Sequence, residues 1–202
     1  KAISCHRLHA SPQIREGVAM THRQQQAAFL DRDGTVIEDT GYLATLDDIR
    51  FLPGAILAIK RLNDAGFLVV IATNQSGVAR GCFSESFVLD VHEAMNRQLR
   101  SHGAHFDGLY YCPHHVDGSV AEYSRPCECR KPKTGMFQLA TRLLGPFSQP
   151  SYMFGDRESD MEFARSADLR PCFIGSHRPE IGDVFCHAAS LADAVDFVLT
   201  AR

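Results

Sequence analysis

Short apolar runs that alternate with helical stretches constrain this sequence more than any other feature. The runs "AAFL" at 27–30 and "FLVVIAT" at 67–73 are continuously apolar, which is typical of strands buried on both faces of a sheet. Between them, "PGAILAIKRLNDAG" reads as a helix. Further strands are expected at 106–111, 151–154 and 171–174, and further helices after a cap at Ser84 and near 135–144, 158–167 and 190–200. This alternation predicts an α/β fold: a doubly wound parallel sheet with helices on both sides.

Length and charge narrow the class of protein. With 202 residues and 45% hydrophobic content, the chain fits one domain, which we expect over residues 27–202 after a mostly irregular extension at 1–26. A net charge of −3 favours neither a nucleic-acid partner nor a membrane surface. Because we find neither a membrane-spanning run nor a secretion signal, we expect a cytoplasmic protein. A monomer is expected, since no helix reads as apolar all round.

Two aspartates follow the first strand. Asp31 and Asp33 stand one residue apart in "FLDRDGT", and Gly34 turns the chain directly after them. In a doubly wound sheet, ligands bind beyond the carboxyl ends of the strands, so both carboxylates are expected to face a site. A calcium loop that began at Asp31 would need glycine at its sixth position and glutamate at its twelfth, but Val36 and Tyr42 stand there.

Other polar motifs follow the later strands. Thr73 opens "TNQSG", which is rich in hydroxyl, amide and backbone N–H groups suited to phosphate oxygens. "GDRESD" adds Asp156 and Asp160, and "CRKPKTG" contains Lys131. A carboxylate can attack phosphorus only if a metal and a cation shield it from the negative charge of the phosphate. The motifs therefore predict a phosphoryl-transfer site.

A cysteine-rich loop precedes the lysine motif. In "CPHHVDGSVAEYSRPCECRKP", Cys112 is followed by two histidines, His114 and His115, and later by Cys127 and Cys129. Three thiolates and one imidazole make a closed tetrahedral set of the kind that holds structural zinc. A loop with free buried cysteines is the alternative, and either histidine fits the fourth position. If zinc is present, it fixes a long loop that delivers the lysine motif to the phosphate site.

The motifs "DRDGT", "TNQSG", "RKP" and "GDRESD", in this order, resemble those of the haloacid dehalogenase (HAD) superfamily of phosphatases, from Ala27 to the C-terminus. The resemblance implies that Asp31 is the nucleophile that forms an aspartyl-phosphate. It implies that Asp33 protonates the leaving alkoxide and later activates water. Thr73 and Lys131 would hold the phosphoryl oxygens.

The resemblance also implies two metals. Mg²⁺ would be bound by the Asp31 carboxylate, the Asp33 backbone carbonyl and Asp156, with Asp160 supporting the loop from behind. One branch of the superfamily carries a zinc loop of this kind, and its pattern favours His114 over His115. The implied zinc ligands are Cys112, His114, Cys127 and Cys129.

The short gaps between the motifs leave no room for a lid domain. Within the lidless zinc branch, "GY" at 41–42, "TNQSGVARG", "YYCPHH", "CRKP" and "GDRESDM" resemble the heptose bisphosphate phosphatases, which prepare heptose for lipopolysaccharide core or surface-layer glycans. The expected partner is then a small phosphorylated sugar. The substrate contacts implied by the match are Asp39, Thr40, Gly41, Tyr42, Thr73, Asn74, Gln75, Ser76, Arg130, Lys131 and Arg157.

Three alternatives stay open from the residues. Arg157, in "GDRESD", is closer to the histidinol-phosphate phosphatases of the same branch. A zinc-stabilised binding module without catalysis is the alternative of another class, but a binder needs no set of Asp31, Asp33, Lys131 and Asp156. A polynucleotide 3′-phosphatase would require a basic groove, which the acidic balance of the chain disfavours.

Overall fold

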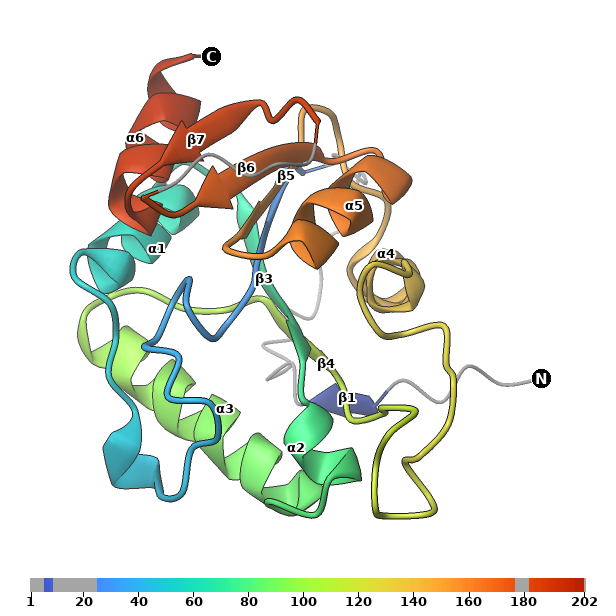
Figure 1. The fold of residues 1–202 in the computed structure, drawn as a ribbon. Coiled ribbons are helices and arrows are strands. Elements are labelled where there is room, and N and C mark those ends of the chain that lie inside the picture. The colour runs from blue at the N-terminus through green and yellow to red at the C-terminus, as the bar shows by residue number, and fades with distance from the viewer. Residues whose placement is uncertain (1–5, 9–24, 177–181, 202) are drawn as a thin grey trace, which may run out of the picture.

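One seven-stranded sheet organises the protein, in the strand order β1-β4-β3-β2-β5-β6-β7 (Figure 1). The structure, a computed structural model, describes residues 6–8, 25–176 and 182–201. Six strands run parallel, and β1 pairs with β4 in the antiparallel direction. The strands are β1 (His6–Leu8), β2 (Ala27–Leu30), β3 (Leu68–Asn74), β4 (Gly108–Cys112), β5 (Tyr152–Gly155), β6 (Arg170–Ile174) and β7 (Cys186–Ala188).

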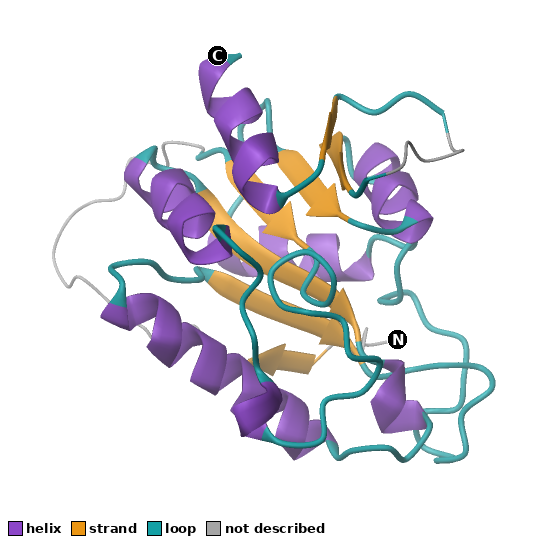
Figure 2. Cartoon of the chain, turned by 60° about the vertical axis from the view of Figure 1, so that its left-hand side comes forward, coloured by secondary structure: helices purple, strands orange, loops and turns teal. Residues whose placement is uncertain are grey.

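The central strands are largely apolar because helices cover both faces of the sheet (Figure 2). Along β2, Ala28 and Leu30 belong to one hydrophobic cluster, whereas Ala27 and Phe29 belong to the other. α1, α3 and α6 contribute to the first cluster, and α4 and α5 to the second. The helices are α1 (Ala55–Asp64), α2 (Ser76–Ala79), α3 (Glu85–Ser101), α4 (Gly135–Leu144), α5 (Glu158–Ser166) and α6 (Leu191–Thr200), with a 3₁₀ turn η1 (Leu46–Asp48).

The predicted fold class is confirmed, and so is the predicted start of α3 at Ser84. The Ser84 hydroxyl accepts a hydrogen bond from the backbone N–H of Phe87 and so begins α3 as expected. The buried face of that helix carries Val88, Val91, Met95 and Leu99, whose spacing of three to four residues places them on one side. No large lid domain interrupts the described residues.

Three short elements were not predicted. The strand β7 has three residues, and η1 and α2 have three and four, so none is long enough to show a hydrophobic period. Within the extension expected to be irregular, His6–Leu8 pairs with β4 as β1, while residues 1–5 and 9–24 lie outside the described part. No helix in the described ranges is both long enough and apolar enough to cross a membrane.

The order of the strands decides where a site can form. β2 is flanked by β3 on one side and β5 on the other, so the chain leaves β2 at the point where the winding of the sheet reverses. The carboxyl ends of these neighbouring strands open a crevice there. The residues that follow β2 and β5 and those that end β3 are Asp31, Asp156 and Thr73.

Candidate active site

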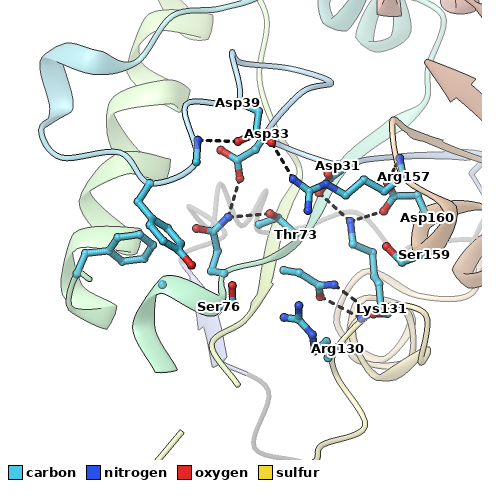
Figure 3. Close-up of a pocket in the computed structure, with 16 residues that line it drawn as sticks. Asp31, Asp33, Asp39, Thr73, Ser76, Arg130, Lys131, Arg157, Ser159 and Asp160 are labelled. Carbon is cyan, nitrogen blue, oxygen red and sulfur yellow. Dashed lines mark hydrogen bonds and ion pairs between the residues drawn. The ribbon is translucent and has the colours of Figure 1, made fainter. Parts of the chain in front are cut away.

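A pocket of about 420 Å³ lies at the carboxyl ends of β2, β3 and β5 (Figure 3). Its walls come from the loop after β2, the start of α2, the end of the cysteine-rich loop and the start of α5. The residues that line it are Asp31, Asp33, Asp39, Gly41, Tyr42, Thr73, Asn74, Gln75, Ser76, Gly77, Phe83, Arg130, Lys131, Arg157, Ser159 and Asp160. Four carboxylates and three cations therefore share one cavity.

Asp31 lies buried in this pocket, directly after β2. Its backbone N–H donates to the carbonyl of Phe154, which continues the sheet by one residue and fixes where the side chain starts. The Nζ of Lys131 lies 2.7 Å from Oδ1 of Asp31 and 2.6 Å from Oδ1 of Asp160. Burial raises the pKa of Asp31, and the attraction of the Lys131 ammonium opposes that rise. The carboxylates of Asp160 and Asp31 outweigh the effect of burial on Lys131 and raise its pKa, so the lysine stays charged.

Gly34 explains the glycine of the first motif. Its φ of +80° lies in the left-handed region, and a Cβ there would stand 2.2 Å from Oδ2 of Asp156. A side chain at position 34 would therefore displace the Asp156 carboxylate. The same holds at Gly155, where a Cβ would meet the Asp160 carboxylate at 2.4 Å. Both glycines leave room for carboxylates next to Asp31.

Three carboxylates gather at the same point. Oxygens of Asp31, Asp156 and Asp160 lie within 4.8 Å of one another. Asp160 is occupied on both oxygens, since Oδ1 meets Lys131 and Oδ2 accepts from the backbone N–H of Arg157. Oδ1 of Asp156 is also buried, and among the described residues it has neither a hydrogen bond nor an ion pair such as the one that Asp160 makes. Burial and the charges of Asp31 and Asp160 raise the pKa of Asp156 to about 7. The cluster therefore suits a divalent cation, with Asp156 as the free ligand.

Asp33 points into the pocket from the turn after Asp31. Its Oδ2 accepts a hydrogen bond of 2.8 Å from the Gln75 amide, which also donates to Oγ1 of Thr73 at 2.9 Å. Arg32 holds the same carboxylate from behind, at 2.9 Å. Sequence reasoning assigned no role to Arg32, although a cation between two aspartates was a visible signal.

The end of the cysteine-rich loop is clamped to β3. The side-chain amide of Asn74 accepts from the backbone N–H of Lys131 at 3.0 Å and donates to its carbonyl at 3.2 Å. Asn74 was expected to contact the substrate, and it does line the pocket. Its side-chain amide, however, hydrogen-bonds to the backbone of Lys131. Arg130, the residue before, donates to the carbonyl of His114 at 3.3 Å and lines the pocket as well.

The cysteine-rich loop gathers four possible metal ligands. The Sγ atoms of Cys112, Cys127 and Cys129 lie 3.4 to 3.5 Å from one another, and Nδ1 of His114 lies 3.4 Å from Cys129 and 3.8 Å from Cys112. A tetrahedral zinc ion with Zn–S bonds of about 2.3 Å implies sulfur separations of about 3.8 Å, close to this arrangement. The structure places His114 in the cluster, whereas His115 lies near Arg80, 3.5 Å from its guanidinium.

The three thiols compete for ionisation. Hydrogen bonding from Cys112 lowers the pKa of Cys127 to about 6, and hydrogen bonds to Cys127 and Cys129, together with burial, raise the pKa of Cys112. One thiolate therefore forms at the expense of another. A bound dication would remove this competition, because it stabilises every thiolate at once. The chemistry of this donor set fits zinc.

The predicted substrate residues do not all reach the pocket. Ten of the eleven line it, and Thr40 is exposed outside it. Asp39 and Arg157, both expected to contact substrate, are paired with each other at 2.7 Å (Figure 3). Phe83 was not predicted, although its ring packs edge-on to Tyr42 at 6.0 Å and both rings line the pocket.

The comparisons with known proteins agree with this geometry. A model of the HAD-hydrolase-like family matches residues 128–194. The D-glycero-beta-D-manno-heptose-1,7-bisphosphate 7-phosphatase of Yersinia pestis is 48% identical over 143 residues, 71% of this chain and 76% of that protein. The enzyme of the same name from Haemophilus ducreyi is 46% identical over 147 residues, 72% of this chain and 80% of that protein.

A solved structure is similar over nearly the whole chain. The D,D-heptose 1,7-bisphosphate phosphatase from B. bronchiseptica, complexed with magnesium and phosphate, superposes with a TM-score of 0.77 at 31% identity. The match covers 88% of this chain and 100% of that one.

Proposed function

Because the chain belongs to the HAD-like hydrolases, in the family of the D-glycero-beta-D-manno-heptose-1,7-bisphosphate 7-phosphatases, we propose that it removes the 7-phosphate of D-glycero-D-manno-heptose 1,7-bisphosphate. The observation that carries the proposal is the buried Asp31 carboxylate, in a pocket that is also lined by Asp33, Thr73 and Lys131. This set supplies a nucleophile, an acid and two groups for phosphoryl oxygens. The product would serve the synthesis of heptose-containing lipopolysaccharide.

The reaction runs in two transfers. In the first, an Asp31 carboxylate oxygen attacks phosphorus, the bond from phosphorus to the sugar oxygen breaks, and Asp33 gives its proton to that oxygen. In the second, Asp33 takes a proton from water as the water oxygen attacks phosphorus. The bond from Asp31 to phosphorus then breaks and inorganic phosphate leaves. Thr73 and Lys131 hold the phosphoryl oxygens through both transfers.

Magnesium would be held by the side chains of Asp31 and Asp156 and by the backbone carbonyl of Asp33. The unpartnered Oδ1 of Asp156 supports this assignment, and so does the excess of carboxylates over cations in the pocket. When bound, the ion offsets the negative charge that a phosphate brings to a carboxylate nucleophile. Asp160, with both oxygens engaged, acts as a support for Lys131 and for the start of α5.

Zinc would be held by Cys112, His114, Cys127 and Cys129, with a structural role. With four protein ligands the ion has no open position for catalysis, so its contribution is the shape of the loop. That loop ends in Arg130 and Lys131, which lie at the pocket. A second anchor is Glu85 of α3, whose carboxylate accepts from the hydroxyls of Tyr111 and, in the loop itself, Tyr123.

The pocket walls suit a sugar that carries a second phosphate. Arg130 and Arg157, which line the pocket, are cations beyond the Lys131 that the transferred group requires. A phosphoryl group on an exocyclic carbon reaches a buried carboxylate more easily than one attached to the ring, which favours reaction at the 7-position. The aromatic pair Tyr42 and Phe83 offers an apolar surface to the sugar.

The histidinol-phosphate alternative rested on Arg157. In the structure that guanidinium is paired with Asp39, so its presence follows from a contact within the protein as well as from any substrate. The relatives that match at 44–48% identity carry the heptose name, which disfavours this alternative. The non-catalytic module is disfavoured by a nucleophile, acid and lysine that converge on one pocket.

Phosphate release tests the proposal directly. D-glycero-D-manno-heptose 1,7-bisphosphate and histidinol phosphate are compared side by side with Mg²⁺, and Asp31→Asn serves as the blank. We expect strong preference for the bisphosphate, with the 1-phosphate retained on the product by ³¹P NMR. Preference for histidinol phosphate would overturn the substrate assignment, and phosphate release by the blank would overturn the site.

A further inference from the structure

Arg32 is a buried cation that the two transfers do not use. It stands between Asp31 and Asp33 in the chain, and only 4% of its surface is exposed. Its Nε lies 3.1 Å from both carboxylate oxygens of Asp33, and a terminal nitrogen lies 2.9 Å from Oδ1. A guanidinium that meets one carboxylate through two nitrogens fixes both the position and the orientation of that carboxylate.

Gln75 closes a three-membered network around Asp33. A terminal nitrogen of Arg32 donates to Oε1 of Gln75 at 2.9 Å, and Nε2 of Gln75 donates to Oδ2 of Asp33 at 2.8 Å. The same Nε2 donates to Oγ1 of Thr73. The Gln75 amide thus has its oxygen toward the cation and its nitrogen toward the carboxylate and the hydroxyl, so one orientation satisfies all three partners.

Asp33 supplies the carboxyl group that faces Arg32, and a neighbouring histidine adds no competing charge. His92 of α3 is buried, and burial together with the Arg32 charge lowers its pKa well below the ordinary value, so the imidazole is neutral. His92 therefore adds no second positive charge beside the guanidinium. Within the described ranges, Asp33 is the carboxyl group that pairs with Arg32, and the low dielectric of a buried site strengthens such a contact.

We propose that Arg32 and Gln75 are positioning residues that hold Asp33 for proton transfer to the leaving oxygen. This inference rests on the proposed function, in which Asp33 gives up a proton as the bond from phosphorus to oxygen breaks. At that moment Asp33 becomes a carboxylate, and the guanidinium already lies where this charge forms. Because Gln75 donates to both Asp33 and Thr73, it fixes the position of the acid relative to the hydroxyl that binds the phosphoryl oxygens.

The ratio of kcat/KM for an alkyl phosphate to that for an aryl phosphate distinguishes a positioning role of Arg32 from a purely structural one. A sugar alkoxide must be protonated to leave, whereas the p-nitrophenolate of p-nitrophenyl phosphate leaves without a proton. The constant kcat/KM reports the steps up to the first transfer, in which the leaving group departs. If Arg32 acts through Asp33, its removal lowers kcat/KM for the sugar phosphate and leaves the aryl phosphate nearly unchanged.

The experiment uses the full chain with Mg²⁺ and the variants Arg32→Met, Arg32→Lys and Gln75→Met. Arg61→Met, which removes an exposed arginine of α1, is the matched control. We expect Arg32→Met to lower kcat/KM for the heptose bisphosphate about 100-fold and for p-nitrophenyl phosphate less than about threefold, in the range of acid catalysis. Arg32→Lys should recover part of the loss, because it restores the charge without the paired contact.

A double-mutant cycle completes the test. In an Asp33→Asn background, Arg32→Met should cost little more, because its partner is already gone. Equal losses on both substrates, or fully additive effects, would overturn the proposal. If Arg32→Met does not fold, Arg32→Lys, which keeps the charge without the paired contact, carries the same comparison. Gln75→Met is expected to lower kcat/KM for both substrates, because Gln75 also holds Thr73.

Failure of the proposed substrate gives a different pattern. A wild-type protein that hydrolyses p-nitrophenyl phosphate and another alkyl phosphate, but not the bisphosphate, refutes the substrate while the alkyl-to-aryl ratio still tests Arg32. A protein that hydrolyses none of them overturns both proposals.

Discussion

The ammonium of Lys131 lies 2.7 Å from a carboxylate oxygen of Asp31, although 100 positions of the chain separate the two residues. The contact depends on Asn74, whose amide clamps the backbone of Lys131 to the end of β3. It also depends on Asp160, which shares the ammonium. A buried cation thus joins the cysteine-rich loop to the strand ends.

Removal of that cation should affect stability as well as activity. Lys131→Met leaves the Asp31 and Asp160 carboxylates buried without their partner, and we expect a loss of about 3–5 kcal/mol in the free energy of unfolding without Mg²⁺. Urea denaturation measures it. Lys133→Met is the matched control, since this exposed lysine pairs with Glu128 at the surface and its loss should change stability little. Equal stability of the two variants would contradict the buried pairing.

Asp31→Asn should abolish turnover and leave the fold intact. An amide of the same shape keeps the packing but cannot attack phosphorus, so neither product phosphate nor a phosphorylated protein should form. Phosphate release and intact-protein mass spectrometry after rapid quenching measure the two outcomes. Asp47→Asn, at an exposed position, should behave as wild type. Turnover by Asp31→Asn would rule out the covalent path.

The pKa of Asp156 predicts how metal-free stability depends on pH. Its value of about 7 lies above the ordinary 3.8, so between these pH values the native protein keeps a proton that the unfolded chain has lost. Stability in EDTA should therefore fall as pH rises through this range, by up to about 1.4 kcal/mol per pH unit, and level off above pH 7. Burial of Asp31 acts in the same direction.

Magnesium should reverse this trend, because the ion binds the deprotonated carboxylates. Thermal unfolding at several pH values, with EDTA or with Mg²⁺, measures both effects. Asp156→Asn should flatten the slope in EDTA and remove most of the stabilisation by Mg²⁺. A stabilisation by Mg²⁺ that does not grow with pH would argue against these ligands.

Loss of zinc should disorder the cysteine-rich loop. Cys127→Ser removes one thiol of the cluster, whose pKa is lowered to about 6, and Cys82→Ser, at an exposed free cysteine, is the matched control. We expect faster hydrogen exchange over residues 113–130 and a fall in kcat/KM of about 100-fold, the effect of misplacing Lys131 by about 1 Å. Metal analysis should find one zinc per wild-type chain. Full activity in a zinc-free protein would refute the positioning role.

The sheet and the catalytic motifs were readable because their signals are local. A strand buried on both faces is apolar along its length, as β2 and residues 68–72 of β3 are, and a parallel sheet brings the polar residues at the ends of such strands to one edge. The positions of Asp31, Thr73 and Asp156 follow from that rule. Gly34 and Gly155 are also part of these motifs, because a side chain at either position would collide with a carboxylate of the site.

Other features depended on contacts between distant segments. β7 is too short for a period, and it exists because β6 offers it an edge. The motif "TNQSG" predicted a phosphate-binding cluster, but packing decided that Asn74 clamps Lys131 and Gln75 turns to Asp33. An amide has no local preference between such partners, so only their positions in space select one.

The local sequence pattern was sufficient to predict the fold class, the polar motifs that follow the strands and the set of possible metal ligands. Hydrophobic period and residue chemistry are properties of neighbouring positions, so they can be read from the sequence. The assembled molecule was needed to bring His114, which the family resemblance favoured over His115, to the three thiols, to pair Arg157 with Asp39 and to place Arg32 behind Asp33. Each of these choices is a hydrogen bond or ion-pair geometry. Such geometries arise only when loops from separate strands are held at one edge of the sheet, since their energy depends on distances of a few ångströms.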